Sequence, residues 1–387
     1  MTSPLANGVR EKVLIMAGGT GGHVFPALTI AQELMTRGAE VEWLGTRQGL
    51  EARVIGATDI PMHFISIGGL RGKSLVKKLL APFVIVRAVI QAVLAIRQIK
   101  PGCVLGMGGF VTGPGGIAAR MLGKKLIIHE QNAIAGLTNQ LLFPFTHVVM
   151  EAFPGAFRKK QQLSHTNNLL NRMMAPEKIQ VVGNPVRAEI LALAPAESRL
   201  AHRQGALHVL VLGGSLGAVA INRVMPELLA GMNEADRPLV RHQCGDRNLD
   251  ATLQLYRDSG LELDKKIQVQ AFIQDMAEAY EWADIVICRA GASTIAELAV
   301  AGLPSILVPY PSAVDDHQAA NARTLEQAGA AWVVPQKEFT AEKIARILAS
   351  LAANHSRLLQ RARAAASMAK RDATSRAATL CLEACHG

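Results

Sequence analysis

Aromatic residues and cysteines are scarce in this chain of 387 residues. Phe, Trp and Tyr together make up 4% of it, too few for a protein that stacks the bases of single-stranded nucleic acid on aromatic rings. The five cysteines are odd in number and include no C-x-x-C pair. A disulfide framework or a zinc site is therefore not expected, and a reducing compartment is.

The chain also lacks an uninterrupted apolar run of membrane-spanning length. The longest candidate, residues 79–99, is broken by Arg87 and Gln91, and Gln98 lies on the same helical face, which predicts an amphipathic helix. The N-terminal stretch MTSPLANGVREK has no apolar segment typical of a secretory signal peptide. We expect a cytoplasmic protein that is soluble or bound to a membrane surface.

Charge is distributed unevenly along the chain. Residues 1–183 hold 20 lysines and arginines against 9 acidic residues, whereas residues 184–387 hold 21 against 22. An anionic partner is therefore expected to contact the first half. Because no recognition helix or zinc finger is visible, an anionic membrane leaflet or a polyphosphate substrate fits better than nucleic acid.

Short β-branched runs alternate with helical patterns, which predicts βαβ units and parallel sheets. The expected strands are Val13–Ala17, Val41–Gly45, His63–Ile67, Val104–Gly108, Leu126–His129, Val148–Glu151, Gln180–Gly183, Val209–Gly213, Val240–Gln243, Ile267–Phe272, Ile285–Cys288, Ile306–Pro309 and Trp332–Val334. The two halves echo each other, since VLIMAGGTGGH and VLVLGGSLGA each run from a buried strand into a glycine turn. We predict an α/β protein of two Rossmann-like, doubly wound domains, residues 1–183 and 184–366. GNPVR forms the hinge, and a helix over about 367–387 packs on one domain.

Glycine-rich turns after strands are the first candidate sites. Gly18–His23 can bring backbone N–H groups to an anion, although a tight βα turn without a ligand is the alternative. His23 is either a surface residue at a helix end or a general base. GMGGFVTGPGG (Gly106–Gly116) is expected to form an exposed loop that wraps phosphates. His129-Glu130-Gln131-Asn132 places polar residues where a strand ends, and it lacks the second histidine of a zinc-protease motif.

Two further segments in the second half point to a ligand. In Cys288–Pro304, Ser293 and Thr294 are expected to cap a helix that faces phosphate, and Glu297 is either a first-turn acid or a ribose ligand. In the segment from Asp315 to Asn321, Gln318 and Asn321 share a helical face suited to sugar hydroxyls, unless the segment is a solvated loop. No D-x-D pair occurs, so no metal is expected.

Taken together, these motifs resemble the GT-B glycosyltransferases of family 28 over nearly the whole chain. The matching segments, in the family's order, are AGGTGGHVFPAL, GLRGK, GMGGFVTGPGG, HEQNAIAGLTN, AFPGAF, GNPVR, GGSLGA, WADIVICRAGASTIAELAVAGLP and DDHQAANA. The resemblance implies a GT-B fold whose two domains face a cleft, with the acceptor and membrane on the first and the UDP-sugar on the second. Residues 158–178 are longer than the family's usual stretch, and their role stays open.

The same resemblance implies an activity in peptidoglycan synthesis. GlcNAc would pass with inversion from UDP-GlcNAc to the 4-hydroxyl of the muramyl residue of undecaprenyl-pyrophosphoryl-MurNAc-pentapeptide (lipid I), giving lipid II, without a cofactor. The enzyme would be peripheral, at the cytoplasmic face of the inner membrane, with an anionic membrane surface and other cell-wall enzymes as further partners. Leu75–Val86, beside Lys73, Lys77 and Lys78, would face the membrane, unless that helix packs on the sheet.

Residue roles also follow from the resemblance. The implied donor contacts are Thr20, Gly21, Gly22, Asn132, Arg187, Ser215, Ile273, Ala292, Ser293, Thr294, Ile295, Ala296, Glu297 and Gln318. Ile273 would contact uracil through its backbone, and Glu297 would hold the ribose. The acceptor pyrophosphate would lie on Gly108, Gly109, Gly113 and Gly115. His23 is the first candidate for the base that deprotonates the 4-hydroxyl, and Glu130 is the second.

Four alternatives share part of this pattern. A UDP-GlcNAc epimerase would use the same donor site without needing a basic half, and a transferase that makes a galactolipid would differ only in its acceptor. A peripheral scaffold with a regulatory nucleotide site should show damage in the glycine loops or at Glu297, and none is visible. A dehydrogenase would carry the usual dinucleotide fingerprint, which is missing.

Overall fold

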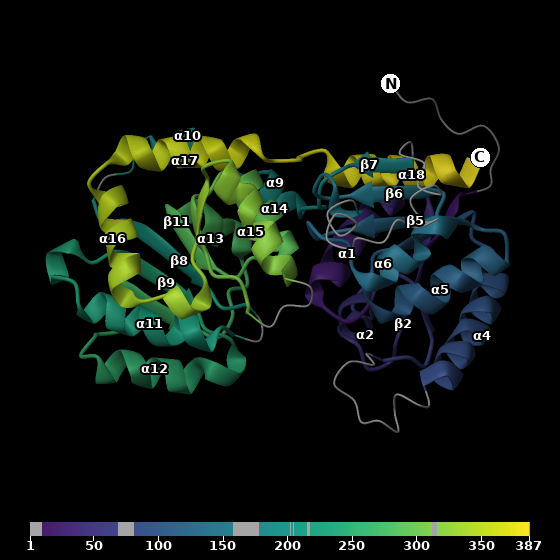
Figure 1. Ribbon diagram of the computed structural model, residues 1–387, viewed down its shortest axis with the longest axis horizontal. Coiled ribbons are helices and arrows are strands. Elements are labelled where there is room, and N and C mark those ends of the chain that lie inside the picture. Colours follow the sequence, from purple (N-terminus) through teal and green to yellow (C-terminus); the bar gives the residue numbers. More distant parts are fainter. Residues whose placement is uncertain are drawn as a thin grey trace, which may run out of the picture. The chain divides into compact units, whose positions relative to one another are not determined.

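The computed structural model describes residues 10–68, 81–157, 178–201, 203, 205–214, 217–311 and 316–386 (Figure 1). Ser215, Lys73, Lys77 and Lys78 lie outside the described residues, as do residues 158–177 of the long segment. The chain divides into two compact units, Met1–Pro185 with Asp372–Gly387, and Val186–Arg371. We call them the N-terminal unit and the C-terminal unit.

The N-terminal unit contains a parallel sheet of seven strands in the order β3-β2-β1-β4-β5-β6-β7. Its strands are β1 (Lys12–Met16), β2 (Glu40–Gly45), β3 (Met62–Phe64), β4 (Cys103–Gly106), β5 (Lys125–Glu130), β6 (Val148–Glu151) and β7 (Ile179–Val181). Its helices are α1 (Gly21–Thr36), α2 (Leu50–Ile55), α4 (Ala81–Ile99), α5 (Gly109–Met121), α6 (Leu137–Leu142) and α18 (Ala373–His386), with a 3-10 turn at Phe143–Phe145.

Helices cover both faces of this sheet, and β1 shows why. Its side chains alternate between the faces. Val13 and Ile15 pack into a core with residues of α1 and α18, whereas Leu14 and Met16 pack into a second core with residues of α4 and α5. Because both faces of the strand are buried, the sequence shows a continuous apolar run instead of an alternating one.

The C-terminal helix α18 belongs to the N-terminal unit. Its inner positions are mostly small, and Ala377, Ala378 and Cys381 are fully buried in the core shared with α1. At the rim, Arg37 at the end of α1 donates to the hydroxyls of Ser375 (2.7 Å) and Thr379 (2.8 Å). Apolar packing and these hydrogen bonds together hold the last helix on the first unit.

The C-terminal unit contains a parallel sheet of six strands in the order β10-β9-β8-β11-β12-β13. Its strands are β8 (His208–Leu212), β9 (Leu239–Gln243), β10 (Ile267–Gln270), β11 (Ile285–Cys288), β12 (Ser305–Leu307) and β13 (Ala331–Val333). Its helices are α9 (Ala188–Leu191), α10 (Ala196–Leu200), α11 (Val219–Ala230), α12 (Leu249–Asp258), α13 (Met276–Trp282), α14 (Ala292–Ala301), α15 (His317–Gln327), α16 (Ala341–Ala352) and α17 (His355–Ser367). Short 3-10 turns occur at Glu234–Asp236, Asp246–Asn248 and Gln336–Glu338.

Each of the thirteen predicted strands overlaps an observed strand, and both sheets are parallel. The prediction of two doubly wound α/β domains is therefore confirmed. One element was predicted wrongly. GMGGFVTGPGG does not form an exposed loop, because residues from Gly109 onward form α5. Glycine content was taken as a sign of a loop, whereas in α5 it serves close packing of the helix on the sheet.

Candidate active site

Both units have a topological switch point, where neighbouring strands lead into helices on opposite faces. In the N-terminal unit these strands are β1 and β4, followed by the loops Ala17–Thr20 and Met107–Gly108. In the C-terminal unit they are β8 and β11, followed by the segments 213–218 and 289–291. Ligands of doubly wound sheets bind in the crevice beyond such strand ends. Most of the residues predicted from the sequence lie at these two places.

In the N-terminal unit, the turn after β1 holds His23 in a defined orientation. Gly19 has φ 94°, a conformation that favours glycine, and Thr20 is the N-cap residue of α1. The Thr20 hydroxyl lies 3.1 Å from Nδ1 of His23. In the tautomer that donates from Nδ1 to this hydroxyl, the lone pair of the imidazole is on Nε2, which lies on the side of Gly108.

The turn after β4 packs directly against the first one. Gly109 has φ 80°, and a side chain there would collide with the carbonyl oxygen of Gly18. Gly108 is the N-cap of α5 and Gly109 its first residue. A side chain at Gly108 would lie 3.0 Å from the ring of His23, so this helix start is next to the imidazole. Gly113 lies in the first half of α5 and is partly exposed, whereas Gly115 is buried against Met16. The expected contact between Gly115 and a pyrophosphate is not supported, because its missing side chain makes room for helix packing.

The polar segment after β5 is buried instead of lining an open crevice. His129, Glu130 and Gln131 are at most 2% exposed. Nε2 of His129 lies 2.9 Å from the Gly183 carbonyl, and burial lowers the pKa of His129 to about 4, so the ring is neutral and donates to that oxygen. Asn184 donates to the carbonyl of Gln131 at 2.9 Å. The segment thus fixes the first residues of GNPVR.

Glu130 is fully occupied by hydrogen bonds. Its Oε1 accepts from the backbone N–H (2.9 Å) and the side chain (3.1 Å) of Asn132. Its Oε2 accepts from the N–H of Gly136 (2.9 Å) and from Nδ2 of Asn139 (2.9 Å). A carboxylate held in this way shapes the turn that presents Asn132.

Sequence reasoning missed Glu51, which lies at the start of α2. Its side chain is fully buried and accepts hydrogen bonds from Thr46 and from the N–H of Gly19. It therefore contacts the glycine turn from inside the unit. Its position in the chain, two residues after Gly49 and with no pattern of its own, gave no signal.

In the C-terminal unit, the N-terminus of α14 follows β11. The N-cap is Gly291, without a side-chain hydrogen bond, and the helix begins at Ala292. Ser293 and Thr294 were expected to cap this helix, which is wrong, because both lie within its first turn. The Ser293 hydroxyl is buried and has no hydrogen-bond partner among the described residues. Backbone N–H groups and a hydroxyl at a helix N-terminus suit an anion.

Glu297 lies one turn further along α14, with its side chain 17% exposed. Its Oε1 pairs with Nη2 of Arg187 at 3.2 Å, and its Oε2 accepts from the Tyr280 hydroxyl at 2.9 Å. Desolvation by burial raises the pKa of Glu297, and Arg187 and Tyr280 oppose that shift. Arg187 is the last residue of GNPVR, so this segment supplies the partner of the carboxylate.

The remaining predicted donor residues lie around the same strand ends. The backbone N–H of Ile273 donates to Oε1 of Gln243 at 2.9 Å. Oε1 of Gln318, near the start of α15, accepts from the N–H of Tyr310 at 2.9 Å. Asn321 is fully buried and donates to the carbonyl of Ala290 at 3.2 Å, just before α14. Gln318 and Asn321 thus hold the two loops next to the helix N-terminus.

A buried polar network supports the glycine turn after β8. His242 bonds to the Tyr256 hydroxyl at 2.9 Å and to Oδ1 of Asn222 at 3.1 Å. Asn222 donates to the carbonyl of Cys244 at 3.0 Å, and a side chain at Gly217 would collide with that carbonyl. Burial lowers the pKa of His242 to about 3, so the network contains a neutral ring. The network holds the backbone at Cys244, against which Gly217 packs.

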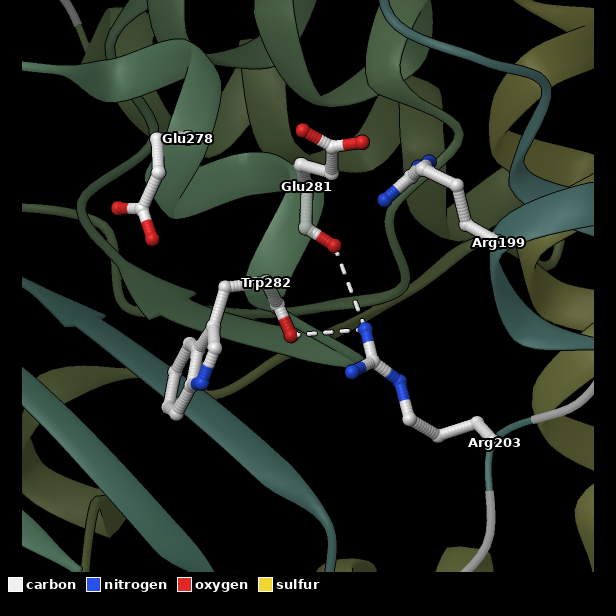
Figure 2. Close-up of a pocket in the computed structure, with 5 residues that line it drawn as sticks. All are labelled: Arg199, Arg203, Glu278, Glu281 and Trp282. Carbon is white, nitrogen blue, oxygen red and sulfur yellow. Dashed lines mark hydrogen bonds between the residues drawn. The ribbon is translucent and has the colours of Figure 1, made fainter. Parts of the chain in front are cut away.

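Figure 2 shows a hollow elsewhere on the C-terminal unit, lined by Arg199, Arg203, Glu278, Glu281 and Trp282. The two arginines donate to the last carbonyls of α13, those of Tyr280 (2.9 Å), Glu281 (3.3 Å) and Trp282 (2.9 Å). They satisfy carbonyl groups at the C-terminal end of α13, and their positive charge interacts favourably with the negative end of the helix dipole. None of the predicted site residues lines this hollow. The hydrogen bonds of the two arginines anchor α13, and Tyr280 on this helix donates to Glu297.

Among the described residues, no group of three or more His, Cys, Asp or Glu side chains is placed to hold a metal ion. The polar groups at the strand ends of the two units include backbone amides, hydroxyls, amide side chains, histidines, arginines and buried carboxylates. Such groups can bind sugar hydroxyls, phosphates and a nucleobase, and a histidine among them can accept a proton.

Comparison with known families gives two matches that together span most of the chain. The family model of the glycosyltransferase family 28 N-terminal domain matches residues 13–150. The model of the glycosyltransferase family 28 C-terminal domain matches residues 208–377.

Individual relatives are similar over nearly their whole length. The UDP-N-acetylglucosamine–N-acetylmuramyl-(pentapeptide) pyrophosphoryl-undecaprenol N-acetylglucosamine transferase of Marinobacter nauticus is 52% identical over 98% of this chain and 99% of its own. The protein of the same name from Pseudomonas fluorescens is 49% identical over 97% and 99%.

Solved structures agree. The crystal structure of MurG from Acinetobacter baumannii superposes with a TM-score of 0.80, at 40% identity over 96% of this chain and 99% of that one. A structure from Listeria monocytogenes named "putative UDP-N-acetylglucosamine 2-epimerase" has a TM-score of 0.65 at 16% identity over 95% of each chain, which shows a shared fold only. With both domain models matched and relatives of about 50% identity covering its full length, this chain belongs to the GT-B glycosyltransferases of family 28.

Proposed function

We propose that the chain transfers GlcNAc from UDP-GlcNAc to the 4-hydroxyl of the muramyl residue of lipid I and so produces lipid II. The observation that carries the proposal is near-full-length identity of about 50% with proteins named for this transfer. The protein named as an epimerase shares the fold at 16% identity, which supports no common activity. The reaction places the chain in peptidoglycan synthesis.

We assign the donor mainly to the C-terminal unit. The diphosphate lies at the N-terminus of α14, where the N–H groups of Ala292, Ser293 and Thr294 and the hydroxyls of Ser293 and Thr294 stabilise the departing UDP. Ile295 and Ala296 complete this first turn, and the N–H of Ile295 donates to the Gly291 carbonyl within the helix. Glu297 accepts hydrogen bonds from the ribose, and Arg187 contributes positive charge. The N–H of Ile273 is held by Gln243, so its carbonyl contacts the uracil. Gln318 binds the sugar, and Ser215, outside the described residues, is retained from the family motif.

We assign the acceptor to the N-terminal unit. Its pyrophosphate lies at the N-terminus of α5, on Gly108 and Gly109, with Gly113 one turn further. Thr20, Gly21, Gly22 and Asn132 contact the transferred sugar. His23 takes the proton of the 4-hydroxyl as the new bond forms. Glu130 is a positioning residue rather than a base, because four hydrogen bonds occupy its buried carboxylate.

We also propose that the protein binds the cytoplasmic face of the inner membrane peripherally, through the N-terminal unit. Exposed apolar side chains cover the outer side of α4, α5 and α6, which pack side by side (Figure 1). They are Phe83, Val86, Ile90, Leu94, Ile117, Met121, Leu137 and Leu141, and Phe145 in the 3-10 turn after α6 is exposed as well. Phe83 is 75% exposed. The three helices carry Arg87, Arg97 and Arg120 and no acidic residue, which suits an anionic leaflet.

Helix α4 is long and apolar enough to cross a membrane by length and composition. Its inner residues Ala88, Ala92 and Ile96 are fully buried in the core of the N-terminal unit. We therefore propose that α4 lies on the bilayer surface instead of crossing it. We also propose that the protein contacts other cell-wall enzymes when it is bound to the membrane.

The proposal is tested by transfer of labelled GlcNAc from UDP-GlcNAc to a short-chain lipid I analogue in the presence of EDTA. We expect product with the unmodified protein, a kcat about 100-fold or more lower with His23→Ala, and a higher donor KM with Glu297→Ala. Consumption of UDP-GlcNAc without transfer to the acceptor would refute the transferase and favour an epimerase. Nearly normal kcat with His23→Ala would keep the transferase and remove His23 as its base.

A further inference from the structure

The side chain of Glu51 fills a space that exists because three neighbouring residues are glycines. A side chain at Gly49 would collide with both carboxylate oxygens of Glu51. A side chain at Gly18 would lie 2.8 Å from Oε1, and one at Gly45 would lie 2.9 Å from Cγ. The carboxylate itself is 0% exposed. Gly18 after β1, Gly45 at the end of β2 and Gly49 before α2 thus leave room for one acidic side chain.

The hydrogen bonds of Glu51 all come from uncharged donors. Its Oε1 accepts from the N–H of Thr46 at 3.0 Å and from the Thr46 hydroxyl at 2.7 Å. Its Oε2 accepts from the N–H of Gly19 at 3.2 Å. Among the described residues, no lysine, arginine or histidine forms an ion pair with it. A buried carboxylate without a counter-ion lowers the stability of the folded protein. We therefore expect a role of Glu51 other than stabilising the fold.

The bond to Gly19 connects Glu51 to the predicted base. Gly19 immediately precedes Thr20, whose hydroxyl lies 3.1 Å from Nδ1 of His23. The N–H of Gly19 points inward to Glu51 and not toward a ligand, so ligand contacts of this turn fall to Thr20, Gly21 and Gly22. Glu51 therefore sets the backbone of the turn one residue before the hydroxyl that orients the imidazole.

Other charged groups near the turn have different partners. Glu130 is bound by Asn132, Gly136 and Asn139. His129 is buried, and its pKa is lowered to about 4. Arg47, which follows Thr46, lies with its guanidinium 4.7 Å from the ring centre of Phe64. Among the described residues, Glu51 is the carboxylate that accepts a hydrogen bond from the turn holding His23.

We propose that Glu51 is a positioning residue for His23 in the transfer reaction. It holds Gly19 and Thr20 in the conformation that orients the imidazole. Its negative charge also favours the imidazolium that forms when Nε2 takes the proton of the acceptor hydroxyl. This inference rests on the proposed function, and in particular on His23 as the base.

The test compares Glu51→Gln with Glu151→Gln. Glu151 is a matched control, because it is a buried carboxylate of the same unit that accepts from the N–H groups of Gly155 (2.8 Å) and Phe157 (3.0 Å). For Glu51→Gln we expect kcat to fall about 10- to 100-fold, as for a lost charged hydrogen bond. The acidic limb of the kcat/KM profile should move to lower pH, and the KM for UDP-GlcNAc should stay within about twofold. Glu151→Gln should lower the melting temperature without moving that limb.

Glu51→Asp separates contact from charge and serves if Glu51→Gln does not fold. The shorter side chain keeps the charge but withdraws it from Gly19, so kcat should fall while the acidic limb stays near its normal pH. The inference is overturned if Glu51→Gln and Glu151→Gln both lower only the melting temperature and both leave the pH profile of kcat/KM unchanged. It is also overturned if Glu51→Asp keeps full kcat. Failure of the proposed base shows separately, because His23→Ala would then remain active whatever Glu51 does.

Discussion

The Tyr280 hydroxyl donates to Oε2 of Glu297 at 2.9 Å, so the carboxylate proposed to bind the ribose is oriented by a buried phenol. Burial raises the pKa of Tyr280 far above its ordinary value, which keeps the hydroxyl protonated and a donor. Arg187 approaches the other carboxylate oxygen. A carboxylate accepts about four hydrogen bonds, so these two partners leave capacity for the hydroxyls of a ribose.

Replacing Tyr280 by Phe should therefore weaken donor binding. Loss of one hydrogen bond to a charged group predicts a KM for UDP-GlcNAc about 5- to 50-fold higher, with kcat within about threefold of normal. Ser350→Ala is the control, since it removes a hydroxyl that donates to the Ile347 carbonyl within α16 of the same unit, at 2.8 Å. Steady-state kinetics with varied donor measure both. An equal rise in KM for the two variants would show a general loss of packing instead.

Two glycines of α5 should respond oppositely to substitution by alanine. A side chain at Gly115 would collide with Met16 in the core, whereas one at Gly113 would meet only Thr138, at 3.6 Å. Gly115→Ala should destabilise the protein by about 1–3 kcal/mol. Gly113→Ala should stabilise it by about 0.5–1 kcal/mol, because alanine favours the helix. Thermal unfolding distinguishes them, and equal stability of both variants would contradict the packing role of Gly115.

These glycines also show how far the sequence could be interpreted. Strands were predicted well because most are short runs rich in apolar and β-branched residues, and the parallel arrangement followed from the alternation with helices. Gly106–Gly116 was misassigned, because glycine spacing looks the same whether it serves a loop or the packing of a helix against Met16 and Leu142. Ser293 and Thr294 were taken as caps because their residue types favour caps, but Gly291 holds that position.

The candidate site divides in the same way. Motif residues such as His23, Arg187 and Glu297 could be named from the sequence, because they lie in segments that match a family in order. The residues that orient them could not. Glu51 lies 32 positions from Gly19, and Tyr280 lies 17 positions from Glu297. No local pattern links such pairs, since the folding of the sheet and its helices brings them together.

Buried histidines in both units should make stability fall in mild acid. The pKa values of His129 (about 4) and His242 (about 3) lie below the unfolded value of about 6.5. The unfolded chain therefore binds more protons between these values. Stability is complete above about pH 6.5 and falls below it, by about 1.4 kcal/mol per pH unit for each histidine, until the folded pKa is reached.

Tryptophan fluorescence can follow this loss in each unit. Trp43 lies in the N-terminal unit, and Trp282 and Trp332 lie in the C-terminal unit. Urea unfolding at pH 7, 5.5 and 4.5 should show a decline for both signals. His242→Gln should lower stability at pH 7 and flatten the decline for Trp282 and Trp332, while Trp43 keeps its normal slope. A slope unchanged in the C-terminal unit would show that His242 is not the group responsible.

Membrane binding should depend on the exposed apolar side of α4. Phe83 and Ile90 are 75% and 55% exposed there, and burying one such side chain in a bilayer is worth about 1.5–3 kcal/mol. Phe83→Glu and Ile90→Glu should each reduce binding to vesicles containing phosphatidylglycerol by about tenfold or more. Met35→Glu is the control, because Met35 is 43% exposed on α1 of the same unit. Transfer to a water-soluble acceptor should be unchanged in all three variants. If the three variants bind vesicles equally well, this side of α4 does not face the membrane.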